Sequence, residues 1–170
     1  MRRHGLTATL ALILGACHAA PPADPTATKD GAAPPPAAAA EPAAEKAPEG
    51  VEAAMDVVRR YYAAIAAGDH ATAYRLWADD GRASGQDFAR FSRGFSETRA
   101  VQATLGAPGG IEGAAGSLYV TIPVTVSAVL NDGTRQHFTG AYVLRRVNDV
   151  PGATAAQRRW HIQSASMRRD

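Results

Sequence analysis

From residue 51 onward the apolar side chains first follow a helical period. Between residues 51 and 67 they recur every three or four positions, which places them on one face of a helix. The residues on this face are Val51, Met55, Val58, Tyr61, Tyr62 and Ile65. Gly68 predicts the end of the helix, because glycine readily takes the left-handed conformation that often follows a last helical turn.

Two shorter helices are expected next. Asp69 is placed to cap a second helix that runs to about Ala78. The segment Ser84-Gly85-Gln86-Asp87 is similar to a capping box with Asp in the acidic position, and it would start a third helix. The aromatic residues on one face of that third helix are Phe88, Phe91 and Phe95.

After Glu97 the period changes to two, which predicts strands. A first strand is expected over 98–105, followed by a glycine-rich turn over 106–116. From Leu118 to Ser127 apolar residues alternate strictly with other residues, so one face of this second strand should be buried. Pro123 cannot donate a ladder hydrogen bond, so it marks an edge or a bulge.

Two further strands complete the pattern. Asn131-Asp132-Gly133 is typical of a hairpin turn leading to a strand over 136–147. A loop over 148–157 then precedes a last strand over 158–167. Three N-terminal helices followed by a four-stranded antiparallel meander predict a single α+β domain over residues 51–170.

The beginning of the chain is typical of a targeting segment. The basic head Met1-Arg2-Arg3-His4 precedes an apolar run from Gly5 to Leu14, too short for the roughly 20 residues of a membrane-spanning helix. This pattern predicts a signal peptide over residues 1–16. Leu14-Gly15-Ala16-Cys17 resembles the bacterial lipobox, in which the cysteine sulfur receives a diacylglycerol and becomes the new N-terminus. The alternative is an ordinary secretory signal that contains a cysteine by coincidence.

Lipidation of Cys17 would anchor the protein in a membrane of the cell envelope. Each buried methylene contributes about 0.8 kcal/mol, so the two or three acyl chains of a lipoprotein hold firmly. Cys17 is the only cysteine in the chain, so its lipidation leaves none for a disulfide. His18, rather than Asp, follows it, and by resemblance to enterobacterial sorting rules this favours the outer membrane, with the domain facing the periplasm.

Residues 17–50 comprise the lipidated cysteine and a segment rich in proline and alanine. From residue 18 to residue 50 it contains no aromatic residue and no Val, Ile or Leu. Such a segment cannot bury enough apolar surface to offset the entropy of ordering, so a disordered tether is expected. Loss of Arg2 and Arg3 with the signal leaves 16 of the 18 basic residues against 16 acidic ones. The basic residues of the domain are scattered arginines, so nucleic acid is not an expected partner.

Two groups of residues carry a resemblance to the NTF2-like superfamily, whose cone-shaped fold is shared with SnoaL-like proteins. Tyr61-Tyr62 and Ile65 before Gly68-Asp69, with Ala73-Tyr74-Arg75-Leu76 after them, resemble its opening helical hairpin. Residues 140–144 and 160–162 resemble its penultimate and final strands. The resemblance implies that the helices close the concave side of a curved four-stranded sheet and leave a pocket. Members of the superfamily include isomerases, dehydratases, cyclases, transport adaptors and secretion-system components.

Aromatic side chains are the candidates for lining that pocket. Taken singly, each is more simply explained by packing in the core. Together they predict a concave apolar site in which tyrosine hydroxyls and tryptophan N–H groups need partners. The candidates are Tyr61, Tyr62, Trp77, Phe91, Phe95, Phe138, Tyr142 and Trp160.

No residue is assigned a catalytic role. Enzymes on this fold use an Asp or His in the pocket with a Tyr or Asp that polarises a carbonyl. Here Asp69 and Asp87 stand at helix starts, and His70 is expected in solvent. Strand alternation places His137 and His161 opposite the aromatic rows. The histidines do not cluster at metal-ligand spacing, so neither a metal nor another cofactor is expected.

The sequence favours an envelope lipoprotein whose NTF2-like domain binds a protein partner or a small apolar ligand without catalysis. The first alternative is a periplasmic enzyme of the isomerase, dehydratase or cyclase type that uses the cone pocket. The second is a scaffold component of a secretion or cell-wall complex. The resemblance also implies a homodimer through the sheet face as one arrangement.

We predict that membrane attachment depends on Cys17. The variant Cys17→Ser lacks the sulfur that accepts lipid, so it should lose both the acyl label and its place in the membrane fraction. Cells grown with labelled palmitate and then fractionated provide the measurement. Continued labelling and membrane retention of the variant would contradict lipidation.

Overall fold

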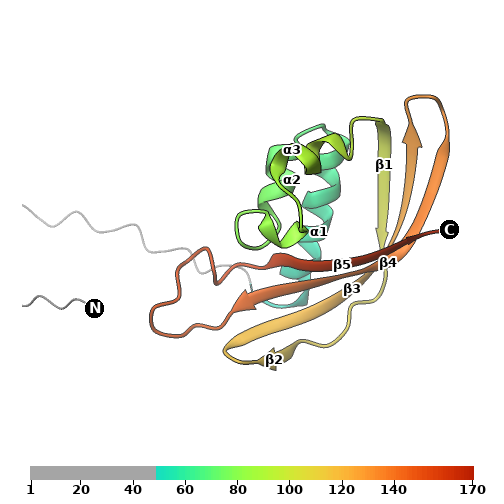
Figure 1. Ribbon diagram of the computed structural model, residues 1–170. Coiled ribbons are helices and arrows are strands. Elements are labelled where there is room, and N and C mark those ends of the chain that lie inside the picture. The colour runs from blue at the N-terminus through green and yellow to red at the C-terminus, as the bar shows by residue number, and fades with distance from the viewer. Residues whose placement is uncertain (1–48) are drawn as a thin grey trace, which may run out of the picture. The chain divides into compact units, whose positions relative to one another are not determined.

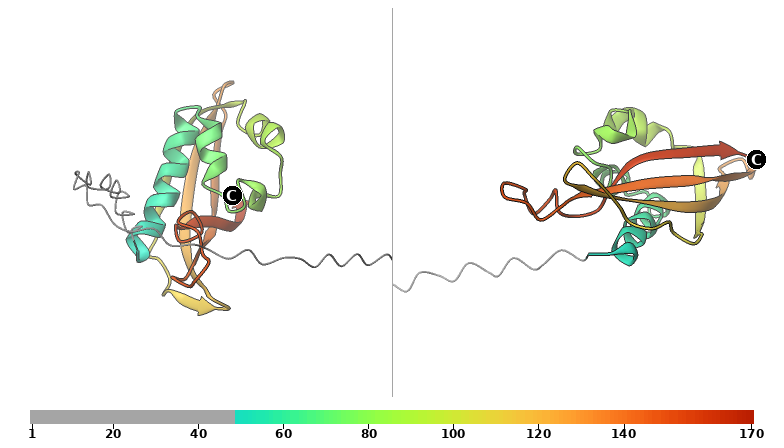
Figure 2. Two further views of the ribbon diagram at one scale, coloured as in Figure 1. Left: turned by 90° about the vertical axis from the view of Figure 1, so that its left-hand side faces the viewer. Right: turned by 90° about the horizontal axis from the view of Figure 1, so that it is seen from below.

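The computed structural model describes residues 49–170. The predicted signal peptide over 1–16 and all but the last two residues of the predicted tether over 17–50 lie outside the described residues. The helices lie on the concave side of a bent antiparallel sheet (Figures 1 and 2). The helical segments are α1 (Val51–Ala66), α2 (His70–Arg75), the 3-10 turn η1 (Arg82–Ser84) and α3 (Phe88–Arg93).

The sheet has the strand order β1-β3-β4-β5, with a short β2 paired to β3. All of these pairings are antiparallel. The predicted α+β class and sequential meander are confirmed, but the sheet has five strands instead of four. The strands are β1 (Thr98–Leu105), β2 (Glu112–Ala114), β3 (Ser117–Leu130), β4 (Arg135–Val147) and β5 (His161–Arg169).

The additional strand β2 lies within the predicted glycine-rich turn. Ala114 pairs with Ser117, and the two residues between them, Ala115 and Gly116, have φ of 45° and 75°. Two consecutive positive φ values are typical of the tight turns that suit the twist of a β-hairpin. The sequence did not predict this hairpin, because alanine is an uncommon residue at the first of the two turn positions.

The first helix ends as the sequence predicts. Its buried face carries Val58, Tyr61 and Ile65, spaced three and four residues apart. Gly68 has φ +73° and donates its N–H to the carbonyl oxygen of Ile65 at 3.0 Å. A left-handed residue here satisfies a carbonyl that has no partner within the helix, so Gly68 terminates α1. Among the described residues, none of the helices has the length and apolar character needed to cross a membrane.

The second helix begins as predicted and ends earlier. The carboxylate of Asp69 accepts a hydrogen bond from the Thr72 N–H at 2.9 Å, which is an N-cap bond. The helix stops at Arg75 instead of continuing to Ala78, because the next residues pair with the sheet. The Ala78 N–H donates to the Ile162 carbonyl at 2.8 Å, and Trp77 forms a parallel bridge with Ile162.

The capping box proposed for the third helix is wrong in its first residue. Ser84 ends the η1 turn, and its hydroxyl lies 3.4 Å from the Gln86 carbonyl oxygen. Asp87 is the N-cap and accepts from the Arg90 N–H at 2.7 Å. A short carboxylate side chain reaches the backbone N–H three residues ahead, so Asp87 itself supplies the cap.

The alternating pattern of β3 is confirmed. Val120, Ile122 and Val124 point into the core, and the residues between them lie on the outer face. The Pro123 carbonyl accepts from the Gly106 N–H just after β1 ends. In an antiparallel sheet the N–H and the C=O of one residue point to the same neighbouring strand. The Pro123 nitrogen therefore points to the side of β1, at a position where β1 has ended and no ladder hydrogen bond is lost. Pro123 thus occupies a local edge, and the pairing of β3 with β4 continues through it without a bulge.

Gly140 allows β5 to approach the inner face of β4 closely. A Cβ atom at this position would lie 2.0 Å from the Ser166 carbonyl oxygen and 2.7 Å from the Met167 sulfur. The side-chain hydrogen of glycine leaves the space that this approach requires. Any larger residue at position 140 would therefore clash with the backbone of β5.

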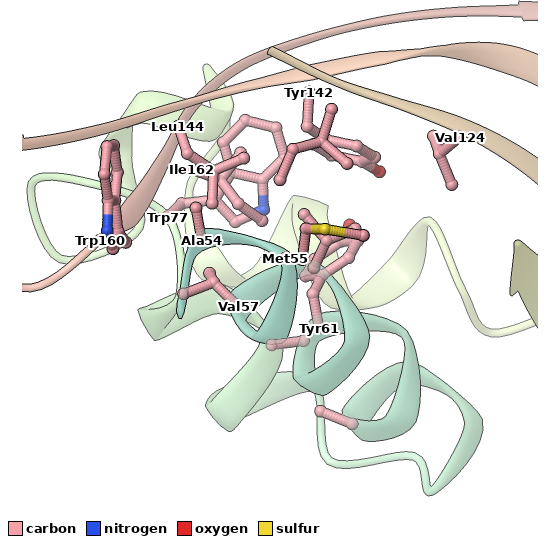
Figure 3. Close-up of a cluster of buried hydrophobic side chains, with 14 of the residues drawn as sticks. Ala54, Met55, Val57, Tyr61, Trp77, Val124, Tyr142, Leu144, Trp160 and Ile162 are labelled. Atoms are coloured by element: carbon pink, nitrogen blue, oxygen red, sulfur yellow. The ribbon is translucent and has the colours of Figure 1, made fainter. Parts of the chain in front are cut away.

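The core lies between α1 and the inner face of the sheet (Figure 3). Trp160 precedes β5 and is 3% exposed, and Phe91 of α3 has the same exposure. Ile122, Leu144 and Ile162 contribute fully buried side chains from the three longest strands. Burial of these apolar side chains is the main favourable contribution to the free energy of folding.

We predict that truncating Trp160 or Phe91 to alanine lowers the free energy of unfolding by about 3–5 kcal/mol, the range for large core aromatics. Phe88→Ala is the matched control, because Phe88 is 45% exposed on the same helix as Phe91. Urea denaturation followed by circular dichroism measures all three variants. Equal losses for Phe91→Ala and Phe88→Ala would refute the packing described.

Candidate functional site

A cavity of about 230 Å³ lies between α1, the end of α3 and the inner face of the sheet. Side chains from β1, β3, β4 and β5 complete its wall, so almost every layer of the domain contributes to it. The lining residues are Tyr61, Tyr62, Gly94, Phe95, Thr98, Val101, Val126, Ala128, Gln136, Phe138, Tyr142 and Met167. The wall is mainly apolar, and its polar side chains are three tyrosines, one threonine and one glutamine.

Two tyrosine hydroxyls meet at the wall of this cavity. The Oη atoms of Tyr62 and Tyr142 are 2.8 Å apart, so they share a hydrogen bond between α1 and β4. The ring of Tyr61 lies beside both, with centroids 5.1 Å from Tyr62 and 5.8 Å from Tyr142. These edge-on and tilted contacts are favourable for aromatic rings and limit how the rings can reorient.

Burial controls the protonation of these tyrosines. Tyr61 and Tyr142 are each 4% exposed. Loss of water disfavours the charged phenolate, and this desolvation raises the pKa of Tyr61, Tyr62 and Tyr142 well above the ordinary value near 10. All three hydroxyls are therefore neutral at physiological pH and act as hydrogen-bond donors and acceptors.

Five of the eight aromatic candidates line the cavity: Tyr61, Tyr62, Phe95, Phe138 and Tyr142. The other three, Trp77, Phe91 and Trp160, are not among its lining residues.

The three other aromatics belong to the buried core. The ring centroid of Trp77 is 6.1 Å from that of Tyr61, and the centroid of Phe91 is 5.2 Å from that of Phe95. Sequence periodicity shows which face of an element a side chain occupies, but not how deep along that face the cavity reaches.

Two polar residues of the wall were not predicted. Gln136 shares the inner face of β4 with Phe138, so strand alternation could have located it. Thr98 could not be found in this way, because the register of β1 shifts between Thr98 and Ala100. Such an irregularity changes the direction of the side chains next to it. Counting alternate residues back from Val101 therefore does not place Thr98 on the inner face.

The candidate bases lie away from the cavity wall. His137 Nδ1 is 3.1 Å from the Ser127 Oγ on the outer face of the sheet. His161 Nδ1 is 2.9 Å from the Arg159 carbonyl oxygen. Asp69 and Asp87 serve as N-caps.

The expectation that His70 is exposed to solvent is wrong. This residue is half-buried, and its Nδ1 lies 2.8 Å from the Ser92 Oγ. Its ring packs against Phe95 at 5.6 Å, because α2 and α3 approach each other here. Phe95 lines the cavity, so His70 stands directly behind that part of the wall. No group of His, Cys, Asp or Glu within residues 49–170 is arranged to hold a metal ion.

No protein-family model and no curated protein matches the sequence, whereas solved structures do match the fold. A candidate scytalone dehydratase from Novosphingobium aromaticivorans has 10% identity and a TM-score of 0.50, over 70% of this chain and 83% of its own. An NTF2-like superfamily protein from Salmonella enterica serovar Typhimurium has 17% identity and a TM-score of 0.47, over 66% and 85%. A candidate dehydratase of the NTF2-like family from Streptomyces avermitilis has 17% identity and a TM-score of 0.45, over 68% and 93%.

The architecture agrees with the expectation from the sequence. Helices close the concave side of a curved antiparallel sheet, and an aromatic cavity lies between these two layers. The domain formed by residues 51–170 therefore has the NTF2-like fold.

Proposed function

We propose that the domain binds a small, mainly apolar ligand carrying a neutral oxygen, and holds it in the aromatic cavity without changing it chemically. The observation that carries this proposal is the pair of neutral hydroxyls of Tyr62 and Tyr142, 2.8 Å apart in an apolar wall. A hydroxyl or carbonyl oxygen on the ligand can join this pair, because each phenol both donates and accepts.

The polarity and size of the cavity narrow the class of ligand. A charged group placed among these side chains would lose its hydration without meeting an opposite charge, which is costly. A volume of about 230 Å³ is below the roughly 300–1,000 Å³ of pockets for drug-sized molecules. A neutral aromatic or alicyclic alcohol or ketone of one or two rings fits both conditions.

The chemistry of the wall favours binding over catalysis. A general acid or base works best with a pKa near the working pH. Among the described residues that line the cavity, none is Asp, Glu, His, Lys, Arg or Cys. The tyrosines are poor bases at neutral pH, and burial moves their pKa further from neutrality. The same hydroxyls can still orient a ligand.

We further propose that the domain works at the cell envelope, anchored through lipid on Cys17. The support for this part is the sequence Leu14-Gly15-Ala16-Cys17, in which the only cysteine of the chain follows a short apolar run. An anchored binding domain would collect its ligand close to a membrane, where apolar molecules are concentrated.

We predict that the tyrosine hydroxyls contribute to affinity for a neutral alcohol. Calorimetric titration with naphthalene and 2-naphthol compares an apolar ring system with and without a hydroxyl group. 2-Naphthol should bind more tightly to the wild type. The double variant Tyr62→Phe with Tyr142→Phe should reduce that advantage by about twofold to tenfold, the value of one hydrogen bond. Because both hydroxyls are removed together, the variant contains no buried hydroxyl that has lost its hydrogen-bond partner.

The control is Tyr119→Phe. Tyr119 lies on the outer face of β3 and does not line the cavity, so its loss should leave the affinity for 2-naphthol unchanged. Chromatography of the recovered ligand tests whether it is unaltered. Equal affinity of the wild type and the double variant for 2-naphthol would refute the proposed role of the hydroxyls, and conversion of the ligand would favour the enzyme alternative.

The buried tyrosines also predict how stability depends on alkaline pH. In the unfolded chain they ionise near pH 10, whereas in the folded domain they keep their protons there. Above pH 10 the folded state then binds more protons than the unfolded state, so the free energy of unfolding falls as the pH rises. Urea denaturation below and above pH 10 should show a shallower fall for the Tyr62→Phe, Tyr142→Phe variant. Parallel curves for variant and wild type would contradict the burial of these phenols.

A further inference from the structure

A second concavity, of about 310 Å³, lies at the other end of β4. Residues 78–82 and the loop between β4 and β5 form its sides. The aromatic cavity takes Gln136, Phe138 and Tyr142 from the beginning and middle of β4, whereas this cleft takes Arg145 and Arg146 from its end. The ionisable side chains of the cleft are Asp79, Asp80, Arg82, Arg145, Arg146 and His161.

Arg146 is buried beside this cleft with part of its hydrogen-bonding capacity unused. Its side chain is 6% exposed, and its Nε has no hydrogen-bond partner among the described residues. Its Nη1 lies 3.8 Å from Glu49 Oε1, which is an ionic contact but too long for a hydrogen bond. A buried guanidinium normally has its donors matched. Arg146 therefore has an ion-pair partner in Glu49 and still lacks a hydrogen-bond partner at its buried Nε.

The neighbouring arginines, Arg82 and Arg145, add positive charge at this end of the cleft. Arg145 donates a hydrogen bond from Nε to the Ser117 Oγ at 3.1 Å, and this bond fixes the position of its guanidinium group. Arg82 forms no ion pair with the described residues. Guanidinium groups bind carboxylates through two parallel hydrogen bonds, so this cluster suits a carboxylate.

The opposite charge in the cleft comes from a fixed turn. Asp79 and Asp80 both have φ of 54°, a left-handed conformation that aspartate tolerates better than most residues. A Cβ at the following residue, Gly81, would lie 2.2 Å from the ring of Tyr74, so the turn is held against that ring. Neither carboxylate lies within 4.0 Å of an arginine nitrogen of the described chain. Charges of both signs thus line one cleft without forming an ion pair with each other.

We propose that this cleft binds a small zwitterion, an amino acid or short peptide with free ends. Its carboxylate contacts Arg145, and its ammonium group contacts Asp79 or Asp80. A simple anion would meet the repulsion of two carboxylates, and a simple cation that of Arg82 and Arg145, whereas a zwitterion is attracted at both ends. This inference stands on residues separate from the aromatic cavity and does not depend on its ligand.

Three dipeptide probes test the charge requirement on the full chain by calorimetric titration. Alanyl-alanine has both charges, N-acetyl-alanyl-alanine keeps only the carboxylate, and alanyl-alanine amide keeps only the ammonium group. Alanyl-alanine should bind about tenfold or more tightly than either blocked form, since each blocked form loses a charge-assisted contact. Equal binding of the N-acetylated form would overturn the proposal in favour of an anion site.

Variants then assign the two ends. Asp79→Asn with Asp80→Asn removes the negative charges and keeps the left-handed turn, because asparagine also accepts positive φ. This variant should bind alanyl-alanine about tenfold more weakly and bind the N-acetylated probe at least as well as the wild type does. Arg145→Gln should weaken both of these probes, with its thermal transition checked to confirm folding.

Matched controls come from charges outside the cleft. Arg99→Gln and Glu112→Gln remove exposed charges on β1 and β2, and both variants should bind alanyl-alanine as the wild type does. The Tyr62→Phe, Tyr142→Phe variant should also leave this binding unchanged, which separates the cleft from the aromatic cavity. Unchanged affinity of the double asparagine variant for alanyl-alanine would overturn the proposal, whatever the outcome for Arg145→Gln.

Discussion

The packing of α1 against the inner face of the sheet is the interaction on which the rest of this domain depends. Ala54, Val57 and Val58 of the helix meet a sheet surface built from alternate residues of the long strands. The described residues contain no cysteine, so no disulfide supplements this contact within the domain. Removing apolar surface from water must therefore supply most of the stability, and the same contact sets the distance between the two layers.

Tyr61 connects that core to the proposed ligand site. Its ring packs against Tyr62, Trp77, Phe91 and Tyr142. The cavity is thus a continuation of the core at a place where the layers diverge, rather than a separate surface feature. Rings held on several sides keep the hydroxyls of Tyr62 and Tyr142 in place before a ligand arrives, which lowers the entropy lost on binding.

The long strand β4 carries two proposed sites of contrasting chemistry. Its inner face changes from Phe138 and Tyr142 to Arg146 within a few residues. One end suits a neutral molecule that prefers an apolar environment, and the other suits a molecule with separated charges. The buried side chains of Leu144 and Ile162 lie between the two, so each site keeps its own electrostatic environment.

The sequence by itself determined the class of fold, the order of the elements and most of their bounds. These features follow from local periods, as in the alternation of β3, and from local hydrogen bonds, as at Asp69 and Asp87. It also identified five of the aromatic residues that line the cavity, because period and alternation show which face of an element a side chain occupies.

Only the tertiary structure decided which aromatics are wall and which are core, and it alone revealed the cleft. Trp77 and Trp160 are aromatic candidates just as Tyr61 and Phe138 are, yet they pack in the core and do not line the cavity. In the sequence Arg146 is one of several scattered arginines. Only the fold shows that it is buried beside the same cleft as Asp79 and Asp80, which lie far from it in the chain. A cavity depends on the spacing between elements, and burial of a charge depends on what covers it. Both are set by contacts between distant segments, which local patterns do not encode.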